Sequence, residues 1–132
     1  MKTETLYKLA AKNNIKVEFF PLTQTKSVCV AVGQNEFIGL ARETLTNADE
    51  KVCLAHELGH CQTGSLYNMY SPLDIREKHE KKADKWALIK LVPKRKLLQA
   101  VKNGDSDIIS LAEHFGVTNE FMQKAINYYN EN

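Results

Sequence analysis

The chain has little of what marks a secreted, membrane-bound or nucleic-acid-binding protein. Its 132 residues include three cysteines and carry a formal net charge of +2. An odd number of cysteines fits reduced thiols better than a disulfide framework. So weak a charge does not indicate electrostatic binding to nucleic acid. No apolar run has the length of a signal peptide or a transmembrane span. We therefore expect a cytoplasmic protein that contacts neither nucleic acid nor membrane.

Internal repeats, low-complexity tracts and phosphate-binding glycine loops are also absent from the sequence. A length of 132 residues is typical of one compact domain, and 43% apolar residues suffice for its core. We predict a single domain over residues 1–132. Its first part, residues 1–64, contains a helix, a small sheet and a motif-bearing helix, and residues 65–132 are helical.

The motif occupies residues 56–60, which are His-Glu-Leu-Gly-His and match H-E-x-x-H. On an α-helix, residues four apart lie on one face, one turn from each other. His56 and His60 can therefore bind the same Zn²⁺ ion. Glu57 is then positioned to accept a proton from a water molecule at the metal. The motif predicts two zinc ligands and a general base.

The residues around the motif predict a buried helix. Thr46 or Asn47 can serve as its N-cap, with an acidic residue at position 49 or 50 as the reciprocal partner, and Gly64 is a suitable end. Gly59 inside the helix costs up to about 1 kcal/mol relative to alanine, which indicates close approach by another element. Buried histidines and a glutamate need partners. A metal satisfies this need; the alternative is a pair of ordinary core histidines.

A second helix is predicted from Ser71, as N-cap, to Leu91, with Pro93 ending it. One face of this helix combines two carboxylates with small and apolar residues, and such a face can pack closely against Gly59. On a helical wheel the face comprises Glu80, Ala83, Asp84, Ala87 and Leu91.

We predict Glu80 as the third zinc ligand. Asp84, one turn later, can accept the remaining N–H of His56 or His60, and carboxylates in this position fix the tautomer of the ligand. Two neighbours compete with Glu80. His79 points about a quarter turn away from the Glu80 face. Glu77 lies near that face but closer to the helix start, where it is also explained as a solvated charge.

Two alternatives concern the chemistry around the motif. Cys53 shares a stripe with the two histidines, so a closed structural zinc site is conceivable if Cys29 adds a fourth ligand; a small buried cysteine is the commoner case. Tyr67, Asn68 or Tyr70, in the link between the two helices, could polarise a substrate carbonyl, although each is also a plausible packing or surface residue.

The remaining segments predict an α+β fold. A helix from Thr3 or Thr5 to Asn13 precedes strands over residues 15–22, 27–32 and 36–41, and an edge strand of such a sheet can bind an extended peptide. Helices are expected over residues 93–103, 105–115 and 118–129. Residues 109–118 resemble the start of a helix-turn-helix, but the helix after them contains a single lysine. We interpret residues 105–129 as a structural pair that closes one side of the cleft.

The two helices together resemble the ImmA/IrrE family of metallopeptidases. After H-E-L-G-H, the chain matches the pattern E-x-x-A-[DN]-x-[FW]-A-x-x-x-L-x-P over residues 80–93, from Glu80 through Ala83, Asp84, Trp86 and Ala87 to Pro93. The resemblance covers nearly the whole chain and is strongest over residues 52–93. It implies a small zincin-like fold with a short sheet packed on the H-E-x-x-H helix. It also implies zinc on His56, His60 and Glu80, with Glu57 as base.

The resemblance further implies a substrate. Members encoded by phages and integrative elements cleave the helix-turn-helix repressor of their own element. The expected function is thus a zinc endopeptidase acting on such a repressor. Two alternatives remain open: a non-catalytic zinc-containing module that sequesters a repressor, and a DNA-binding regulator that uses residues 105–129.

Overall fold

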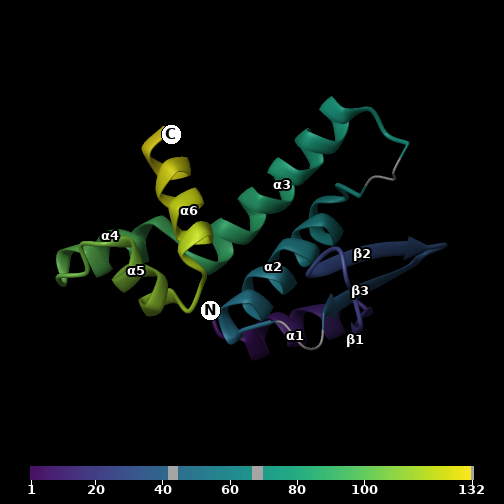
Figure 1. The fold of residues 1–132 in the computed structure, drawn as a ribbon, viewed down its shortest axis with the longest axis horizontal. Coiled ribbons are helices and arrows are strands. Elements are labelled where there is room, and N and C mark those ends of the chain that lie inside the picture. The colour runs from purple at the N-terminus through teal and green to yellow at the C-terminus, as the bar shows by residue number, and fades with distance from the viewer. Residues whose placement is uncertain (42–44, 67–69, 132) are drawn as a thin grey trace.

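The computed structural model has a central helix, α2, with a three-stranded sheet and α1 on one side and the other helices beyond its opposite face (Figure 1). The structure describes residues 1–41, 45–66 and 70–131. This arrangement confirms the predicted α+β fold. The elements in chain order are α1 (Thr3–Lys12), β1 (Ile15–Phe20), β2 (Ser27–Val32), β3 (Asn35–Ala41), α2 (Asn47–Thr63), α3 (Leu73–Leu91), α4 (Lys94–Lys102), α5 (Ile108–Phe115) and α6 (Asn119–Glu131).

The sheet has the order β1-β3-β2, so β1 and β2 are its two edges. β1 runs parallel to β3, and β2 runs antiparallel to it in a hairpin that pairs Val32 with Asn35. β1 ends at Phe20, two residues earlier than predicted, because Pro21 follows and has no N–H to donate to a ladder. β2 packs on α2, and an edge strand therefore lies beside the helix that bears the motif.

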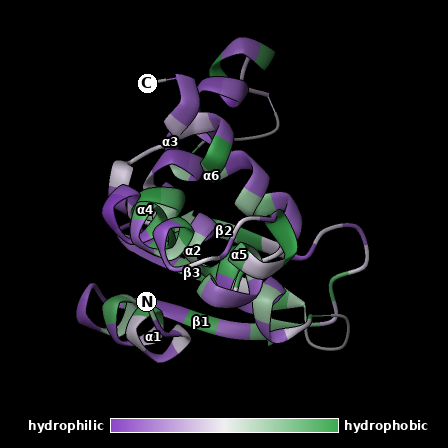
Figure 2. Cartoon of the chain, turned by 90° about the vertical axis from the view of Figure 1, so that its left-hand side faces the viewer, coloured by the Kyte–Doolittle hydropathy of each residue, from purple (hydrophilic) through white to green (hydrophobic). Residues whose placement is uncertain are grey.

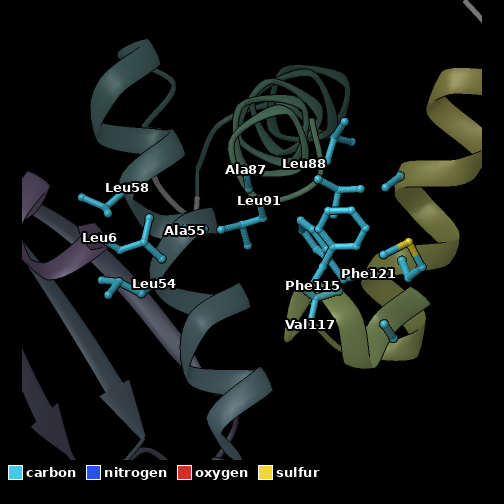
Figure 3. Packing of buried hydrophobic residues seen from close by; sticks show 14 of the residues in the cluster. Leu6, Leu54, Ala55, Leu58, Ala87, Leu88, Leu91, Phe115, Val117 and Phe121 are labelled. Atoms are coloured by element: carbon cyan, nitrogen blue, oxygen red, sulfur yellow. The ribbon is translucent and has the colours of Figure 1, made fainter. Parts of the chain in front are cut away.

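The core connects the sheet side of the molecule to its helical side (Figure 3). Leu6 of α1 packs with Leu54 and Leu58 of α2, and each of these leucines is fully buried. On the other side of α2, Ala87 and Leu91 of α3 continue the cluster toward the C-terminal helices. Burial of one such leucine stabilises the folded state by roughly 1.5–3 kcal/mol. Because buried side chains contact α2 from the sheet side and from α3, the helix is fixed from both sides. Several helices carry both hydrophobic and hydrophilic segments, as expected for elements with one buried face (Figure 2).

The starts of α3 and α5 differ from the sequence prediction. α3 begins at Leu73 with Pro72 as the residue before it, rather than with Ser71 as N-cap. α5 begins at Ile108 rather than at residue 105, because the Asp105 N–H donates to the Ala100 carbonyl at 3.1 Å and so closes α4. The Asp107 side chain then caps α5 by accepting the Ser110 N–H at 2.7 Å. Among the described residues, no helix is both long and apolar enough to cross a membrane.

Candidate metal centre

The ends of α2 are fixed by local hydrogen bonds. The Thr46 hydroxyl accepts the Asp49 N–H at 3.1 Å, and the Asp49 carboxylate accepts the Thr46 N–H, which completes the predicted capping box. Gly64 ends the helix with φ at 64°, a left-handed conformation that favours glycine. The chain turns sharply there, and the Ser65 N–H bonds to the His60 carbonyl at 3.0 Å. This turn brings Ser65 back onto the motif.

The two histidines of the motif face Glu80 of α3. The Nε2 atom of His56 lies 2.8 Å from one Glu80 carboxylate oxygen, and Nε2 of His60 lies 3.1 Å from the other. The three donor groups lie within 4.8 Å of one another and form a group that could bind a metal ion. His79 is not a member of this group among the described residues. The structure therefore brings together the three residues that the sequence predicted as ligands.

The other nitrogen of each imidazole is also engaged. The Ser65 carbonyl accepts a hydrogen bond from His60 Nδ1 at 2.8 Å, and Asp84 accepts one from His56 Nδ1 at 2.8 Å. Because a carbonyl oxygen can only accept, Nδ1 of His60 carries a proton. A neutral imidazole protonated at Nδ1 offers its Nε2 lone pair, so these bonds leave both Nε2 atoms available to a metal.

Gly59 allows α3 to approach this closely. A Cβ atom at position 59 would lie 2.7 Å from the Ala83 carbonyl oxygen and 3.1 Å from the Ala83 Cα atom. Real Cβ atoms essentially never come within 3.0 Å of such a neighbour. The predicted packing of the small-residue face of α3 against Gly59 is confirmed, and it sets the distance from the histidines to Glu80.

The electrostatics of the group favour a cation. Burial on its own lowers the pKa of the His56 imidazole, but hydrogen bonds to Asp84 and Glu80 outweigh it and raise that pKa to about 10. Burial also lowers the pKa of the His60 imidazole. Hydrogen bonds to Glu80 and to the Ser65 carbonyl outweigh this effect, so the pKa of His60 is raised as well. Both shifts report surroundings that stabilise positive charge. Two imidazoles and one carboxylate are also the ligand types that Zn²⁺ takes in catalytic sites, so the residues present fit this metal.

Glu57 is one of the residues that line the site, and it is only 5% exposed. Burial raises the pKa of its carboxyl group, although the neighbouring His56 and His60 act in the opposite direction. The Ser27 hydroxyl of β2 donates a hydrogen bond to Glu57 Oε2 at 3.3 Å. A raised pKa and a fixed orientation both suit a group that accepts and returns a proton.

These groups open onto a cavity of about 390 Å³ between β2 and the two ligand helices. The described residues that line it are Thr25, Ser27, Val28, Cys29, His56, Glu57, His60, Leu66 and Glu80. No residue of the C-terminal pair, α5 and α6, is among them. The prediction that this pair closes one side of the cleft is therefore wrong for the described residues. α6 packs on α3 instead, and its Lys124 ammonium lies 3.7 Å from an Asp84 carboxylate oxygen.

The predicted oxyanion donors are not found in this cavity. Tyr67 and Asn68 lie outside the described residues. Tyr70 is 88% exposed and is not among the described residues that line the cavity. Its role as a substrate contact stays a prediction.

Cysteines lie near the site but do not join the histidines. The group around His56 contains no cysteine among the described residues, whereas Cys29 and Cys61 form a separate cluster with Glu36. This arrangement does not favour a closed zinc site made by Cys29 and Cys53 with the two histidines. Cys53 is half-buried rather than fully buried, and this burial raises the pKa of its thiol.

Sequence reasoning missed Ser27 and Ser65, which contact the base and a candidate ligand. Ser27 is 30 residues from Glu57 along the chain, and no local spacing indicates the pairing of β2 with this helix. Ser65 follows Gly64 directly, so the glycine end of α2 was the signal that its carbonyl returns toward His60.

Fold and site together define a metallopeptidase-type domain. The profile of the Peptidase M78 family, described as the IrrE N-terminal-like domain, matches residues 10–127. The chain therefore belongs to this family, which confirms the resemblance to ImmA/IrrE proteins and the zincin-like fold. A search of curated proteins finds no significant match.

Proposed function

We propose that this protein is a zinc-dependent endopeptidase in which His56, His60 and Glu80 hold the metal and Glu57 is the general base. The observation that carries the proposal is the convergence of three metal-binding side chains and one buried carboxylate on a single open cavity. This geometry is that of an H-E-x-x-H site, in which one helix carries two metal ligands and the base and the next helix carries the third ligand.

A bound zinc ion would supply a Lewis acid that polarises a peptide carbonyl and acidifies a water molecule. Glu57 accepts the proton of that water as it attacks the scissile carbonyl, and then delivers the proton to the leaving amine. The Ser27 hydroxyl holds one Glu57 oxygen, which leaves the other for the water. Asp84 and the Ser65 carbonyl keep the imidazoles in the tautomer that presents Nε2.

Strand addition to β2 is the binding mode that the fold supports for the substrate. β2 is an edge of the sheet, and residues 27–29 line the cavity beside Glu57. An extended peptide laid along such an edge bonds through its backbone, which requires little side-chain sequence. The scissile carbonyl of that peptide would then lie over His56 and His60.

The proposed substrate is a helix-turn-helix repressor made by the same phage or mobile element. The family resemblance supports this substrate class, and the cavity is compatible with it: no lysine or arginine is among its described lining residues. A cleft without such charges gives little discrimination between peptides, so specificity would come from docking the whole repressor. The cut is expected in a linker or at a helix end, where the backbone can become extended.

The experiment is incubation of the zinc-loaded protein with the repressor encoded beside it, with the cut mapped by mass spectrometry. Cleavage at one or a few sites is expected. It should stop on chelation, return on zinc addition, and weaken when the folded domain of the repressor is removed from the target segment. An intact repressor, together with free cleavage of unrelated unfolded proteins, would leave a general peptidase and refute the repressor substrate.

The non-catalytic alternative predicts a different zinc environment. A module that uses zinc as a structural clip needs four convergent protein ligands, including a cysteine sulfur at about 2.3 Å. X-ray absorption at the zinc edge separates sulfur from nitrogen and oxygen neighbours. We expect nitrogen and oxygen alone, because the described group around His56 lacks a cysteine.

A further inference from the structure

Cys29 and Cys61 form a second chemical group next to the proposed zinc site. Their sulfur atoms lie 3.0 Å apart, and both residues are free thiols, half-buried. Cys29 is on the edge strand β2 and lines the cavity, whereas Cys61 directly follows His60 on α2. The pair therefore joins the strand proposed to bind substrate to the helix that carries the histidines.

The surroundings of the pair favour thiol chemistry over a second metal. The only other metal-binding side chain grouped with these sulfurs among the described residues is Glu36 of β3. A structural zinc site takes four convergent protein ligands, and the part of the chain that the structure describes supplies three to this cluster. A disulfide needs only two sulfurs that can approach to about 2.05 Å. From 3.0 Å, that approach is about 1 Å.

We propose that Cys29 and Cys61 are a redox-sensitive site that forms a reversible disulfide and thereby slows peptide cleavage. Cys29 is the member of the pair that lines the open cavity. With hydrogen peroxide as oxidant, its sulfur attacks a peroxide oxygen and becomes a sulfenic acid as one water leaves. The Cys61 sulfur then attacks the Cys29 sulfur, the S–S bond forms, and a second water leaves. Two thiols lose two electrons and two protons, and one peroxide is reduced to two waters. A dithiol reductant reverses the change.

The bond would act on the site through both of its anchors. Ser27, which holds Glu57, is two residues from Cys29, and His60 is adjacent to Cys61. The two sulfur atoms must approach by about 1 Å, and we expect part of this movement to reach β2 and α2 and to shift the base relative to a zinc ligand. A misplacement of up to about 1 Å at a reacting centre can cost up to roughly 100-fold in rate. We expect the oxidised protein to cleave peptide at least about tenfold more slowly. This consequence rests on the proposed function, whereas formation of the bond does not.

The first test reads the bond itself. The full zinc-loaded chain is treated with a small excess of hydrogen peroxide, remaining thiols are alkylated, and peptides are mapped without reduction. We expect a linked Cys29–Cys61 peptide, lighter than the two reduced peptides by two hydrogen atoms, and alkylation of Cys53 alone. The Cys53→Ser variant should still form the link. A wild-type monomer without this link, or with Cys53 linked as often as Cys61, would overturn the proposal.

The second test reads the consequence. Cleavage of an unfolded protein substrate is compared before oxidation, after oxidation and after re-reduction, in the wild type and in the Cys61→Ser variant. Loss and recovery in the wild type, with the variant unaffected relative to its own reduced activity, would support the proposal. A linked protein as active as the reduced one would overturn it. A protein that forms the link on oxidation but cleaves no peptide even when reduced would refute the proposed peptidase and the effect on cleavage. Formation of the disulfide would still be supported. The wild type could instead form no link and bind two zinc ions, one of which is lost in the Cys61→Ser variant. That result would overturn the disulfide and indicate a second metal site at the two cysteines.

Discussion

Replacement of Gly59 by alanine tests whether close helix packing sets the metal site. The added Cβ would lie 2.7 Å from the Ala83 carbonyl oxygen, and ordinary contact begins at 3.4 Å, so α2 and α3 must separate by about 0.7 Å. Overpacking of this kind costs typically 1–3 kcal/mol, whereas alanine gains roughly 0.5–1 kcal/mol over glycine within a helix. We expect a net loss of about 1–2 kcal/mol in the free energy of unfolding.

The same displacement should weaken zinc binding, because Glu80 and Asp84 are on the helix that moves. The assay is urea unfolding of the metal-free protein, paired with zinc affinity from competition with a chromophoric chelator. Adding Ala83→Gly to the variant should not rescue it, since the atoms that a Cβ would meet belong to the Ala83 backbone. A Gly59→Ala protein of equal or greater stability and unchanged zinc affinity would refute the reasoning.

Three further predictions follow from the contacts of the site and of α1. Glu80→Ala should lose most bound zinc while His79→Ala keeps it, because Glu80 faces both imidazoles. The zinc content of each variant is measured by metal analysis after gel filtration. Loss of zinc in His79→Ala and not in Glu80→Ala would exclude Glu80 as the ligand. Asp84→Ala should cost roughly 10–100-fold in zinc affinity or activity. Lys124→Ala should cost much less, because the Lys124 ammonium lies 3.7 Å from Asp84 and is half exposed. Equal losses in the two variants would contradict the role of Asp84 in orienting His56. Tyr7 donates a hydrogen bond to Glu50 at 2.5 Å, and burial, with help from Glu50, raises the pKa of its phenol above the usual 10.0. The folded protein therefore keeps this proton above pH 10.0, where the unfolded chain loses it, and stability should fall as pH rises past that value. Tyr7→Phe should cost roughly 1–2 kcal/mol at neutral pH and should lack this part of the alkaline fall in urea unfolding; an identical alkaline fall in both proteins would exclude Tyr7 as its source.

Local sequence signals predicted the elements that position the site. The capping box at Thr46, the glycine end at Gly64 and the small-residue face of α3 are all present as expected. Each depends on residues close in sequence or on helical periodicity, so a pattern suffices to predict it. The approach of Glu80 to the histidines followed from one such face meeting Gly59.

Contacts between distant segments could not be predicted in this way. The pairing of β2 with α2 places Ser27 on Glu57 and Cys29 on Cys61, and no spacing in the chain encodes either contact. The position of the C-terminal helices α5 and α6 depends on which face of α3 they cover, and the sequence does not indicate that face. The prediction that they line the cleft was therefore wrong for the described residues. Side chains that tune the site are thus set by tertiary packing, whereas its central motif is set locally.

The most direct test of the proposed peptidase is cleavage of an unfolded protein substrate by the wild type and by Glu57→Gln at equal zinc content. The substitution keeps the size of the side chain and leaves His56, His60 and Glu80 in place, but an amide cannot accept the proton of the attacking water. We predict that the variant binds zinc as the wild type does and loses cleavage by at least about 100-fold. Full cleavage by the zinc-loaded variant would contradict Glu57 as the base and, with it, the proposed mechanism.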